Sequence, residues 1–395
     1  MSDTPTTFGT VTKTFHWLTA ILILALLILG TLANDWAADT DSALAIKTTL
    51  FSTHKTLGVL LFFVALLRIV WAIGHRKPGP LHPERKTETL LAEIVHWTLY
   101  GSLVLVPLTG WIDHAASTGF APIWWPFGQS LPFVPKDPEV AHLFGSVHII
   151  LTKVLMGALA LHVAGALKHH FIDKDATLRR MWFGKSQMPD VAYHRTPIAA
   201  PALAAAALAI GAGVGAGMAA GTTAALTTEA LAEVASDWTV QDGALGITVV
   251  QMGDEVTGSF ADWTAAITFD PEATADAGTV EVTVSIGSLT LGSVTDQAMG
   301  ADFFNQANFP TATFAAPITV QDDGSYVADG TLTLKGVEAP VTLPFSLTLD
   351  GDTATASGQT TLNRQTFNIG ESMEGESNLA FDVIVTMDLT ATRNN

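Results

Sequence analysis

The chain has 395 residues, of which 48% are hydrophobic and only 14% are charged, and this composition favours insertion of part of the chain into a membrane. Residues 1–220 carry 16 Lys and Arg against 13 Asp and Glu, whereas residues 221–395 carry 3 against 24. The acidic second half argues against nucleic-acid binding, which needs clustered cations. The absence of cysteine excludes disulfides, thiolate metal sites and covalently attached c-type haem.

Five apolar stretches are each long enough for a helix that crosses a bilayer, which takes about 20 residues. They cover residues 14–34, 50–73, 94–112, 143–167 and 196–221. The second contains Arg68 and the fourth contains Lys153. The first four predict a helical bundle, and the fifth predicts an additional transmembrane helix or linker.

The charges between these stretches predict the orientation of the chain. The positive-inside rule places two basic segments in the cytoplasm, and they hold Arg76, Lys77, Arg85, Lys86, Lys168, Lys174, Arg179, Arg180, Lys185 and Arg195. The loop after the third stretch is poor in cations and rich in tryptophan, which is typical of a periplasmic interface. We therefore expect a bacterial inner-membrane protein with a cytoplasmic N-terminus and a periplasmic C-terminal domain.

The fifth stretch, residues 196–221, is dominated by Ala and Gly. Such a segment resembles the apolar region of a secretory signal, so cleavage at this point is one interpretation. The other is an uncut anchor whose small residues let it pack closely against the bundle.

From about residue 235 the pattern changes to short alternating runs separated by Gly, Asp and Pro. Examples are Leu245–Val250, Val280–Ile286, Thr331–Leu334 and Phe381–Leu389. Regular short strands with turn residues between them predict an antiparallel barrel or sandwich. The roughly 160 residues available suffice for one such domain with its own core.

Four histidines fall inside the predicted bundle. His16 opens the first helix, His54 lies near the start of the second, and His148 and His162 share the fourth. The 14 residues between the last two make nearly four helical turns, so both rings share one face about 21 Å apart. His16 and His162 lie at one depth in the bilayer, and His54 and His148 lie at another. The two histidines at each depth can therefore coordinate one iron ion between them.

Gly58, Gly145 and Gly165 lie three or four residues from these histidines, on the same helical faces, where a missing side chain leaves room for a porphyrin. The alternative is that the histidines only bond between helices or lie among lipid headgroups. The occurrence of two histidines at each of two matching depths favours haem binding over this alternative. A catalytic zinc would need three or four ligands at one depth.

Residues 8–185 resemble the bacterial cytochrome b561 family, a four-helix dihaem membrane protein. The resemblance is carried by Phe15-His16-Trp17-Leu18, His54 to Gly58, His96-Trp97, Pro107 to Gly110, Trp124 to Phe133, Leu161-His162, Lys168 to Phe171 and Asp175 to Arg180. It implies two haems b with axial ligands at His16, His54, His148 and His162. It also implies electron transfer between ubiquinone, or another isoprenoid quinone, and a periplasmic partner, with superoxide as one candidate donor. No catalytic residue is implied.

Other polar residues near these depths are weaker candidates. Arg68 is a candidate partner for a haem propionate, or an arginine that reaches the membrane surface. His96 and His169 are candidate quinone contacts, since reduction of quinone requires protons. Lys55 and Lys153 can attract anions to the haem on the periplasmic side, between His54 and His148. Alternatively, their side chains extend to the membrane interface.

Residues 235–392 resemble the YceI-like family, a lipocalin-type barrel that binds isoprenoid chains. The resemblance is carried by Asp237 to Val240, Val256 to Phe260, Ala301 to Phe304, Phe309 to Phe314, Gly330 to Val337 and Leu362 to Phe367. It implies an eight-stranded barrel wide enough for a slim apolar ligand. Phe303, Phe304, Phe309 and Phe314 are candidate isoprenoid contacts or core residues. Asp296-Gln297 stands where relatives have Arg-Asp, which puts a headgroup contact in doubt.

The sequence therefore predicts a multidomain protein: an all-α dihaem bundle, one extra helix and an all-β antiparallel lipocalin-like barrel. The leading functional interpretation is a membrane cytochrome, and a quinone-linked oxidoreductase activity is compatible with it. A second interpretation is a membrane-tethered isoprenoid carrier or scavenger with a secondary redox role. A third is a cytochrome subunit that docks a separate dehydrogenase.

Overall fold

The structure is a computed structural model that describes residue 3 and residues 7–38, 40–75, 78–117, 121–183, 196–225, 231–232, 234–373 and 375–394. It divides into two compact units. One comprises residues 1–35, 49–116 and 122–221 and holds most of the long helices. The other comprises residues 36–48, 117–121 and 222–395 and holds the β-sheet. Four of the basic residues used to predict the orientation lie outside the described residues, namely Arg76, Lys77, Lys185 and Arg195.

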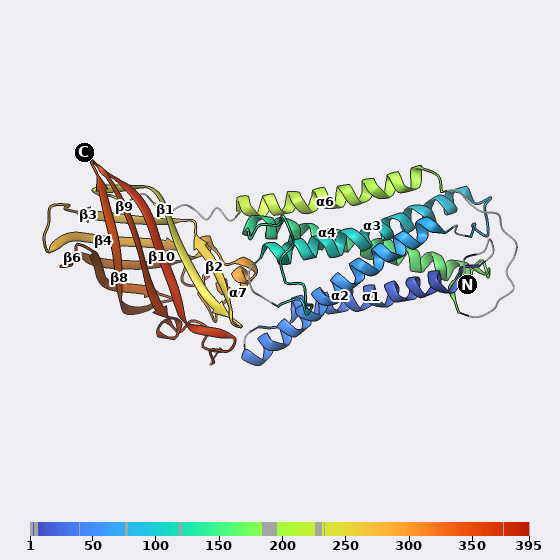
Figure 1. The fold of residues 1–395 in the computed structure, drawn as a ribbon, viewed down its shortest axis with the longest axis horizontal. Coiled ribbons are helices and arrows are strands. Elements are labelled where there is room, and N and C mark those ends of the chain that lie inside the picture. Colours follow the sequence, from blue (N-terminus) through green and yellow to red (C-terminus); the bar gives the residue numbers. More distant parts are fainter. Residues whose placement is uncertain are drawn as a thin grey trace. The chain divides into compact units, whose positions relative to one another are not determined.

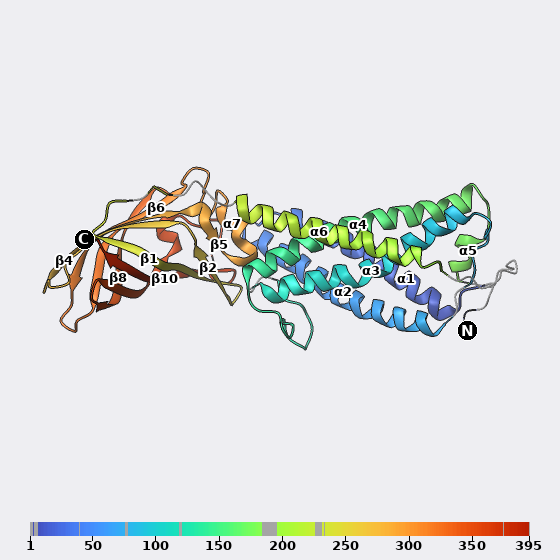
Figure 2. The same ribbon diagram turned by 90° about the horizontal axis from the view of Figure 1, so that it is seen from above.

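The helical unit contains five helices that are long and apolar enough to cross a membrane (Figures 1 and 2). They are α1 (Thr10–Asp35), α2 (Asp41–Gly74), α3 (Lys86–Ala116), α4 (Pro138–Phe171) and α6 (Ala199–Ala225). A short helix, α5 (Thr177–Met181), follows α4. The prediction of a helical membrane domain with one additional helix is confirmed.

The first four helices all extend beyond the predicted apolar stretches. Helix α2 begins at Asp41 instead of near Leu50, α3 begins at Lys86 instead of near Ile94, and α4 begins at Pro138 instead of near Leu143. Asp137 caps α4, because its carboxylate accepts hydrogen bonds from the backbone N–H groups of Glu139 at 2.8 Å and Val140 at 3.2 Å, and proline suits the first helical turn. These ends are polar, so hydropathy alone could not find them.

The interior of the bundle is built from aliphatic side chains on all five long helices. The buried cluster comprises Leu22, Ile23, Leu26, Leu61, Val64, Ala65, Leu103, Val106, Val147, Leu151, Leu155 and Leu208. Many large apolar side chains on the outer faces are exposed, among them Ile28, Leu67 and Val70. A protein surrounded by water rarely exposes so much apolar surface, whereas contact with lipid would cover it.

Helix α6 packs tightly on α3 and α4. A Cβ added at Gly215 would lie 2.7 Å from the Cα of Val147, and one at Gly211 would lie 3.0 Å from Cγ2 of Val154. Gly101 of α3 in turn receives the side chain of Leu208. Small residues at such positions let helix backbones approach closely inside a membrane, so α6 is an integral part of the helical unit.

The second unit is one curled, ten-stranded antiparallel sheet with the order β3-β4-β6-β7-β8-β9-β10-β1-β2-β5 (Figure 1). The strands are β1 (Trp238–Gln251), β2 (Asp254–Phe260), β3 (Trp263–Phe269), β4 (Asp276–Ser285), β5 (Leu289–Thr290), β6 (Thr311–Val320), β7 (Tyr326–Leu334), β8 (Val337–Asp350), β9 (Thr353–Asn363) and β10 (Leu379–Arg393). Helix α7 (Thr295–Met299) and the 3-10 turns η1 (Ile286–Ser288), η2 (Gly292–Val294) and η3 (Arg364–Phe367) complete it.

The lipocalin-like architecture is confirmed, but the sheet has ten strands and two ends, where the sequence predicted eight strands. One of the two end strands, β3, meets the segment just before β1, and this junction forms a seam. The backbone N–H of Asp237 donates to the carbonyl of Ile267 in β3 at 2.9 Å, and the Ser236 hydroxyl accepts from the N–H of Ile267 at 2.8 Å. The strand that enters the domain first is therefore fastened across the seam.

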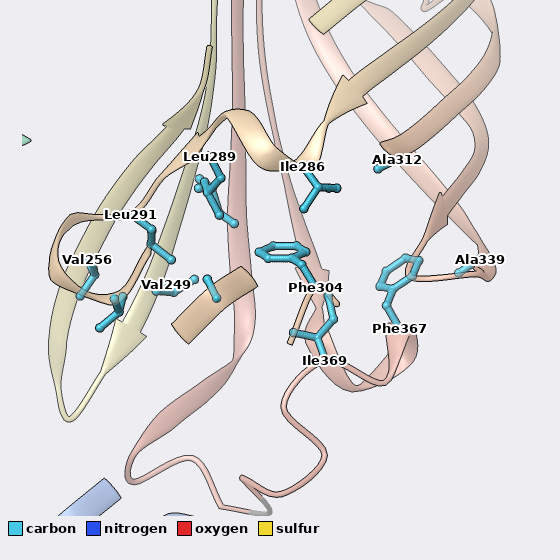
Figure 3. Packing of buried hydrophobic residues seen from close by; sticks show 13 residues of the cluster. Val249, Val256, Ile286, Leu289, Leu291, Phe304, Ala312, Ala339, Phe367 and Ile369 are labelled. Carbon is cyan, nitrogen blue, oxygen red and sulfur yellow. The ribbon is translucent and has the colours of Figure 1, made fainter. Parts of the chain in front are cut away.

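Buried apolar side chains inside the curled sheet form two clusters. Figure 3 shows Phe304, Phe367 and Ile369 gathered with Leu289 and Leu291 in the larger cluster. Trp238 and Phe269 anchor the smaller one. The alternation of inward apolar and outward polar residues along the strands explains why the sequence pattern located this domain.

Candidate functional site

The structure brings the rings of His54 of α2 and His148 of α4 opposite each other, with their planes nearly perpendicular at 88°. Their ring centroids are 6.3 Å apart. The Nδ1 of His54 lies 3.0 Å from the carbonyl oxygen of Leu26, and the Nδ1 of His148 lies 2.9 Å from that of Val106. An imidazole whose Nδ1–H donates to a backbone carbonyl keeps the lone pair on Nε2 and a fixed ring orientation, as metal-binding histidines do.

Two glycines make room for these rings. A Cβ at Gly30 of α1 would lie 2.9 Å from Cε1 of His54, and one at Gly110 of α3 would lie 2.8 Å from Nδ1 of His148. Any other residue would push the imidazole away from its carbonyl partner. Neither glycine was among those predicted to make room for a porphyrin, since a glycine inside an apolar helix is a weak signal.

His16 of α1 and His162 of α4 form the other pair. Their ring centroids are 6.1 Å apart, and His96 of α3 lies edge-on to His162 with a centroid distance of 5.0 Å. The Thr19 hydroxyl donates to the carbonyls of Phe15 and His16 at 2.8 and 2.9 Å, so it anchors the turn that carries His16. His96 is therefore placed at the level of this pair.

Both pairs fit an iron between two imidazoles. Two metal–nitrogen bonds of about 2 Å each, with the distances from ring nitrogen to ring centre, add up to roughly 6 Å between centroids. Gly58 and Gly165, near His54 and His162, have no atom within 4 Å of an added Cβ, which leaves space for a flat ring. Gly145 instead faces the carboxylate of Asp113, at 3.5 Å from an added Cβ.

Arg68 of α2 turns inward. Its Nη1 donates to the Thr19 hydroxyl at 2.7 Å, and its guanidinium lies 5.0 Å from the ring centroid of Tyr100. The side chain is therefore held beside the turn that carries His16. Lys153, by contrast, is exposed on α4.

A polar network that the sequence did not reveal starts at Lys55, the residue after His54. The ammonium group of Lys55 donates to Nδ1 of His114 at 3.2 Å, and Nε2 of His114 donates to Oε1 of Gln129 at 2.8 Å. The same Oε1 accepts from the backbone N–H of Ile123 at 2.7 Å. The chain of bonds gives His114 a proton on Nε2 and ties the loop after α3 to α2.

His169 lies elsewhere, in an ionic cluster at the end of α4. Its Nδ1 is 2.7 Å from Asp175 and its Nε2 is 3.2 Å from Glu88. Lys168 bridges Glu88 at 2.6 Å and Asp173 at 2.9 Å. Glu88, His169 and Asp173 present their ligand atoms within 4.8 Å of one another, but lysine already neutralises both carboxylates, which disfavours a metal ion.

The carboxylates of this cluster are held in their charged form. Hydrogen bonds from Lys168 keep the pKa of Asp173 below its ordinary value. Partial burial raises the pKa of Asp175, but hydrogen bonds from Thr177 and His169 outweigh it and leave that pKa lowered. The cluster therefore fixes the segment after α4 as long as both carboxylates are ionised.

The sheet encloses an apolar cavity of about 300 Å³, within the size range of small-molecule sites. Phe303, Phe304 and Phe314 are among its lining residues. Phe309 is not one of them, since its ring packs against Gly336 of the β7–β8 turn, 2.7 Å from an added Cβ. Three of the four predicted phenylalanines thus face the cavity.

Five helices able to span a membrane and a curled antiparallel sheet define a helical membrane protein with a lipocalin-like domain. Residues 7–184 match the family Prokaryotic cytochrome b561, and residues 238–391 match the YceI-like domain family. The chain thus combines a cytochrome b561 domain with a YceI-like domain. Membership of the first family implies haem b as the cofactor.

Known relatives cover the two domains separately. Cytochrome b561 homolog 2 of Escherichia coli is 29% identical over 187 residues, which are 47% of this chain and 95% of that protein. A protein of Yersinia pestis described as probable superoxide oxidase CybB is 27% identical over 130 residues, 32% of this chain and 72% of that protein. The crystal structure of Burkholderia cenocepacia BcnA is 32% identical, with a TM-score of 0.36, and covers 38% of this chain and 96% of that one.

Proposed function

We propose that this protein holds two haems b, one between His54 and His148 and one between His16 and His162, and moves electrons across the inner membrane. The observation that carries the proposal is the pair of facing imidazoles at each level, with ring centroids 6.3 and 6.1 Å apart. Haem, when bound, supplies reversible one-electron chemistry, while the protein sets orientation and potential.

The chain's own residues define how each haem would be held. The carbonyls of Leu26 and Val106 keep His54 and His148 in one tautomer, with Nε2 available for iron. Arg68 lies beside the His16 level through its bond to Thr19, where a guanidinium can pair with a propionate or with a quinone oxygen. His96, next to His162, is the nearest candidate to carry a proton to or from a quinone.

Haem content tests this assignment directly. The purified protein should contain about two low-spin haems per chain, and His148→Ala and His162→Ala should each lose about one. His170→Ala is the matched control, since His170 is an exposed histidine on the same helix. Full haem content in both variants would contradict the assignment.

The redox partners follow from the membrane setting and from the relatives. We propose quinone as one partner and a periplasmic donor, with superoxide as the first to test, as the other. Anaerobic reduction with quinol and, separately, with superoxide distinguishes the two entry routes. If neither reagent reduces the haem, both proposed partners are wrong.

We propose that the ends of α2 and α4 lie in the cytoplasm and the YceI-like domain in the periplasm. The basic segments after these helices support this orientation under the positive-inside rule. A C-terminal alkaline phosphatase fusion should be active, and one placed after Lys174 should be inactive. The packing of α6 on α4 favours an uncut anchor, so haem and the YceI-like domain should migrate together at the full mass of 41.7 kDa.

We further propose that the YceI-like domain binds an isoprenoid in its apolar cavity. The cavity also supports a second candidate function, an isoprenoid carrier tethered to the membrane. Lipid extraction with mass spectrometry separates the two. A bound quinone that reduces the haem supports redox coupling, whereas a non-redox isoprenoid beside an unresponsive haem supports the carrier.

A further inference from the structure

The cavity of the YceI-like domain is apolar along almost its whole lining. Aliphatic and aromatic residues of nine strands contribute most of it. Apart from tryptophan and methionine, the polar side chains among the described lining residues are Gln251, Gln297, Thr360 and Arg364. A ligand with a polar head would have to satisfy that head at one of these positions.

Gln251 is the last residue of β1 and is only 6% exposed. Within the described part of the chain, its Oε1 is buried and has no hydrogen-bond partner. Native structures rarely leave a buried amide oxygen unsatisfied, because its loss of hydration is then uncompensated. An acceptor of this kind on the wall of a cavity points to a ligand that donates a hydrogen bond.

Arg364 lies next to this position but is fully engaged. It is 3% exposed, and its five N–H groups donate to five backbone carbonyls, those of Ile369, Gly370, Met373, Leu379 and Ala380. A guanidinium has five donors, so none remains for a ligand. Arg364 therefore holds together the backbone segments at this end of the cavity, and it has no donor left to contact the head group of a ligand.

The backbone segments that Arg364 holds also position Gln251. Gln251 is registered opposite Leu379 in the β1–β10 ladder, and the carbonyl of Leu379 accepts from Nη2 of Arg364 at 3.2 Å. The following N–H, that of Met252, donates to the carbonyl of Asn378 at 3.1 Å. The amide of Gln251 is thus presented from a fixed backbone, as a preorganised contact should be.

Thr360 already uses its hydroxyl proton in a hydrogen bond to the carbonyl of Thr342 at 2.9 Å. Among the four polar lining residues, Gln251 is the one whose buried side-chain acceptor has no partner in the described part of the chain. We propose that Gln251 is the head-group contact of the cavity and that the ligand is an apolar chain ending in a hydroxyl-bearing head, whose O–H donates to Oε1. A polyprenol and a hydroquinone share this chemistry. The inference rests on the proposed isoprenoid-binding function and adds the chemical class of the head.

The test uses the full-length, delipidated holoprotein in detergent and pairs of probes that differ only in the donor. Farnesol is compared with farnesyl methyl ether, and, under anaerobic reducing conditions, a short-chain ubiquinol is compared with its dimethyl ether. Native mass spectrometry reports the bound fraction. We expect the hydroxyl form of at least one pair to bind roughly 5- to 20-fold more tightly than its ether. The pair that shows this preference indicates whether the ligand is a polyprenol or a hydroquinone.

Gln251→Leu and Gln251→Met should abolish that preference while ether binding is retained, and Thr360→Val should leave the preference intact. The haem spectrum and unfolding temperature check that each variant is folded. Equal binding of alcohol and ether by the wild type, or a preference that survives in a folded Gln251 variant, overturns the inference while isoprenoid binding stands. If the wild type binds no probe at all, the isoprenoid-binding function fails, and the inference fails with it.

Discussion

Gly215 of α6 and Val147 of α4 lie in backbone contact, since a Cβ added to the glycine would stand 2.7 Å from the Cα of Val147. Val147 directly precedes His148, one of the four facing histidines. The additional helix therefore packs against the segment that carries a proposed haem ligand.

Gly215→Leu should force α6 away from α4. Overpacking of a close interface typically costs about 1–3 kcal/mol, so we expect a lower midpoint of thermal unfolding, followed through haem absorbance. Gly213→Leu is the control, because no atom lies within 4 Å of a Cβ added there. Equal midpoints for the two variants would show that α6 does not support the bundle.

Gly110→Ala should displace the ring of His148. The new methyl would lie 2.8 Å from Nδ1, where it competes with the hydrogen bond to Val106. We expect the haem content to fall by up to one per chain, or the potential of that haem to shift, in a redox titration. Gly157→Ala on α4, which has open space around an added Cβ, should change neither value.

Arg364→Met should destabilise the YceI-like domain, because it leaves five backbone carbonyls without their donor. Each buried polar group left unpaired costs about 1–3 kcal/mol, so we expect a loss of at least about 3 kcal/mol. Differential scanning calorimetry of the full chain should show this as a shift of the domain's own transition. The exposed Arg393 provides the control variant Arg393→Met.

Acidification should loosen the cluster after α4. The pKa values of Asp173 and Asp175 are lowered in the folded protein, so their stabilisation is complete above their ordinary pKa of about 3.9 and is lost as the pH falls through the folded values. Asp175→Asn should lower the unfolding temperature at neutral pH and flatten its decline below about pH 4. Asp350→Asn, an exposed change in the other unit, should leave the bundle transition unaltered.

The sequence could predict the levels of the four histidines because a helix has a fixed rise per residue and a bilayer has a fixed thickness. It could not predict Gly30 and Gly110, since the rotation of one helix against another depends on packing along both. The apolar stretches located five helices, yet Asp41 and Pro138 lie outside them because helix ends need not be apolar.

Among the weaker candidates, the sequence grouped His96 with His169, whereas the structure separates them. His96 lies beside His162, and His169 joins an ionic cluster with Glu88 and Asp175. Glu88 is 81 positions away in the sequence, so local spacing carried no signal of this contact. The same reason hid Gln251, whose environment is set by β10 and η3.

The seam of the sheet has a mechanical consequence. The chain leaving α6 enters the YceI-like domain at Ser236 and Asp237, whose bonds to Ile267 close the seam. Tension along this tether loads those few bonds before it reaches the long β1–β10 ladder. Because Trp238 of β1 is paired with Arg393 of β10, the two ends of the domain's chain lie at the same end of this ladder. A pull on either end would therefore open the ladder from there, one bond after another.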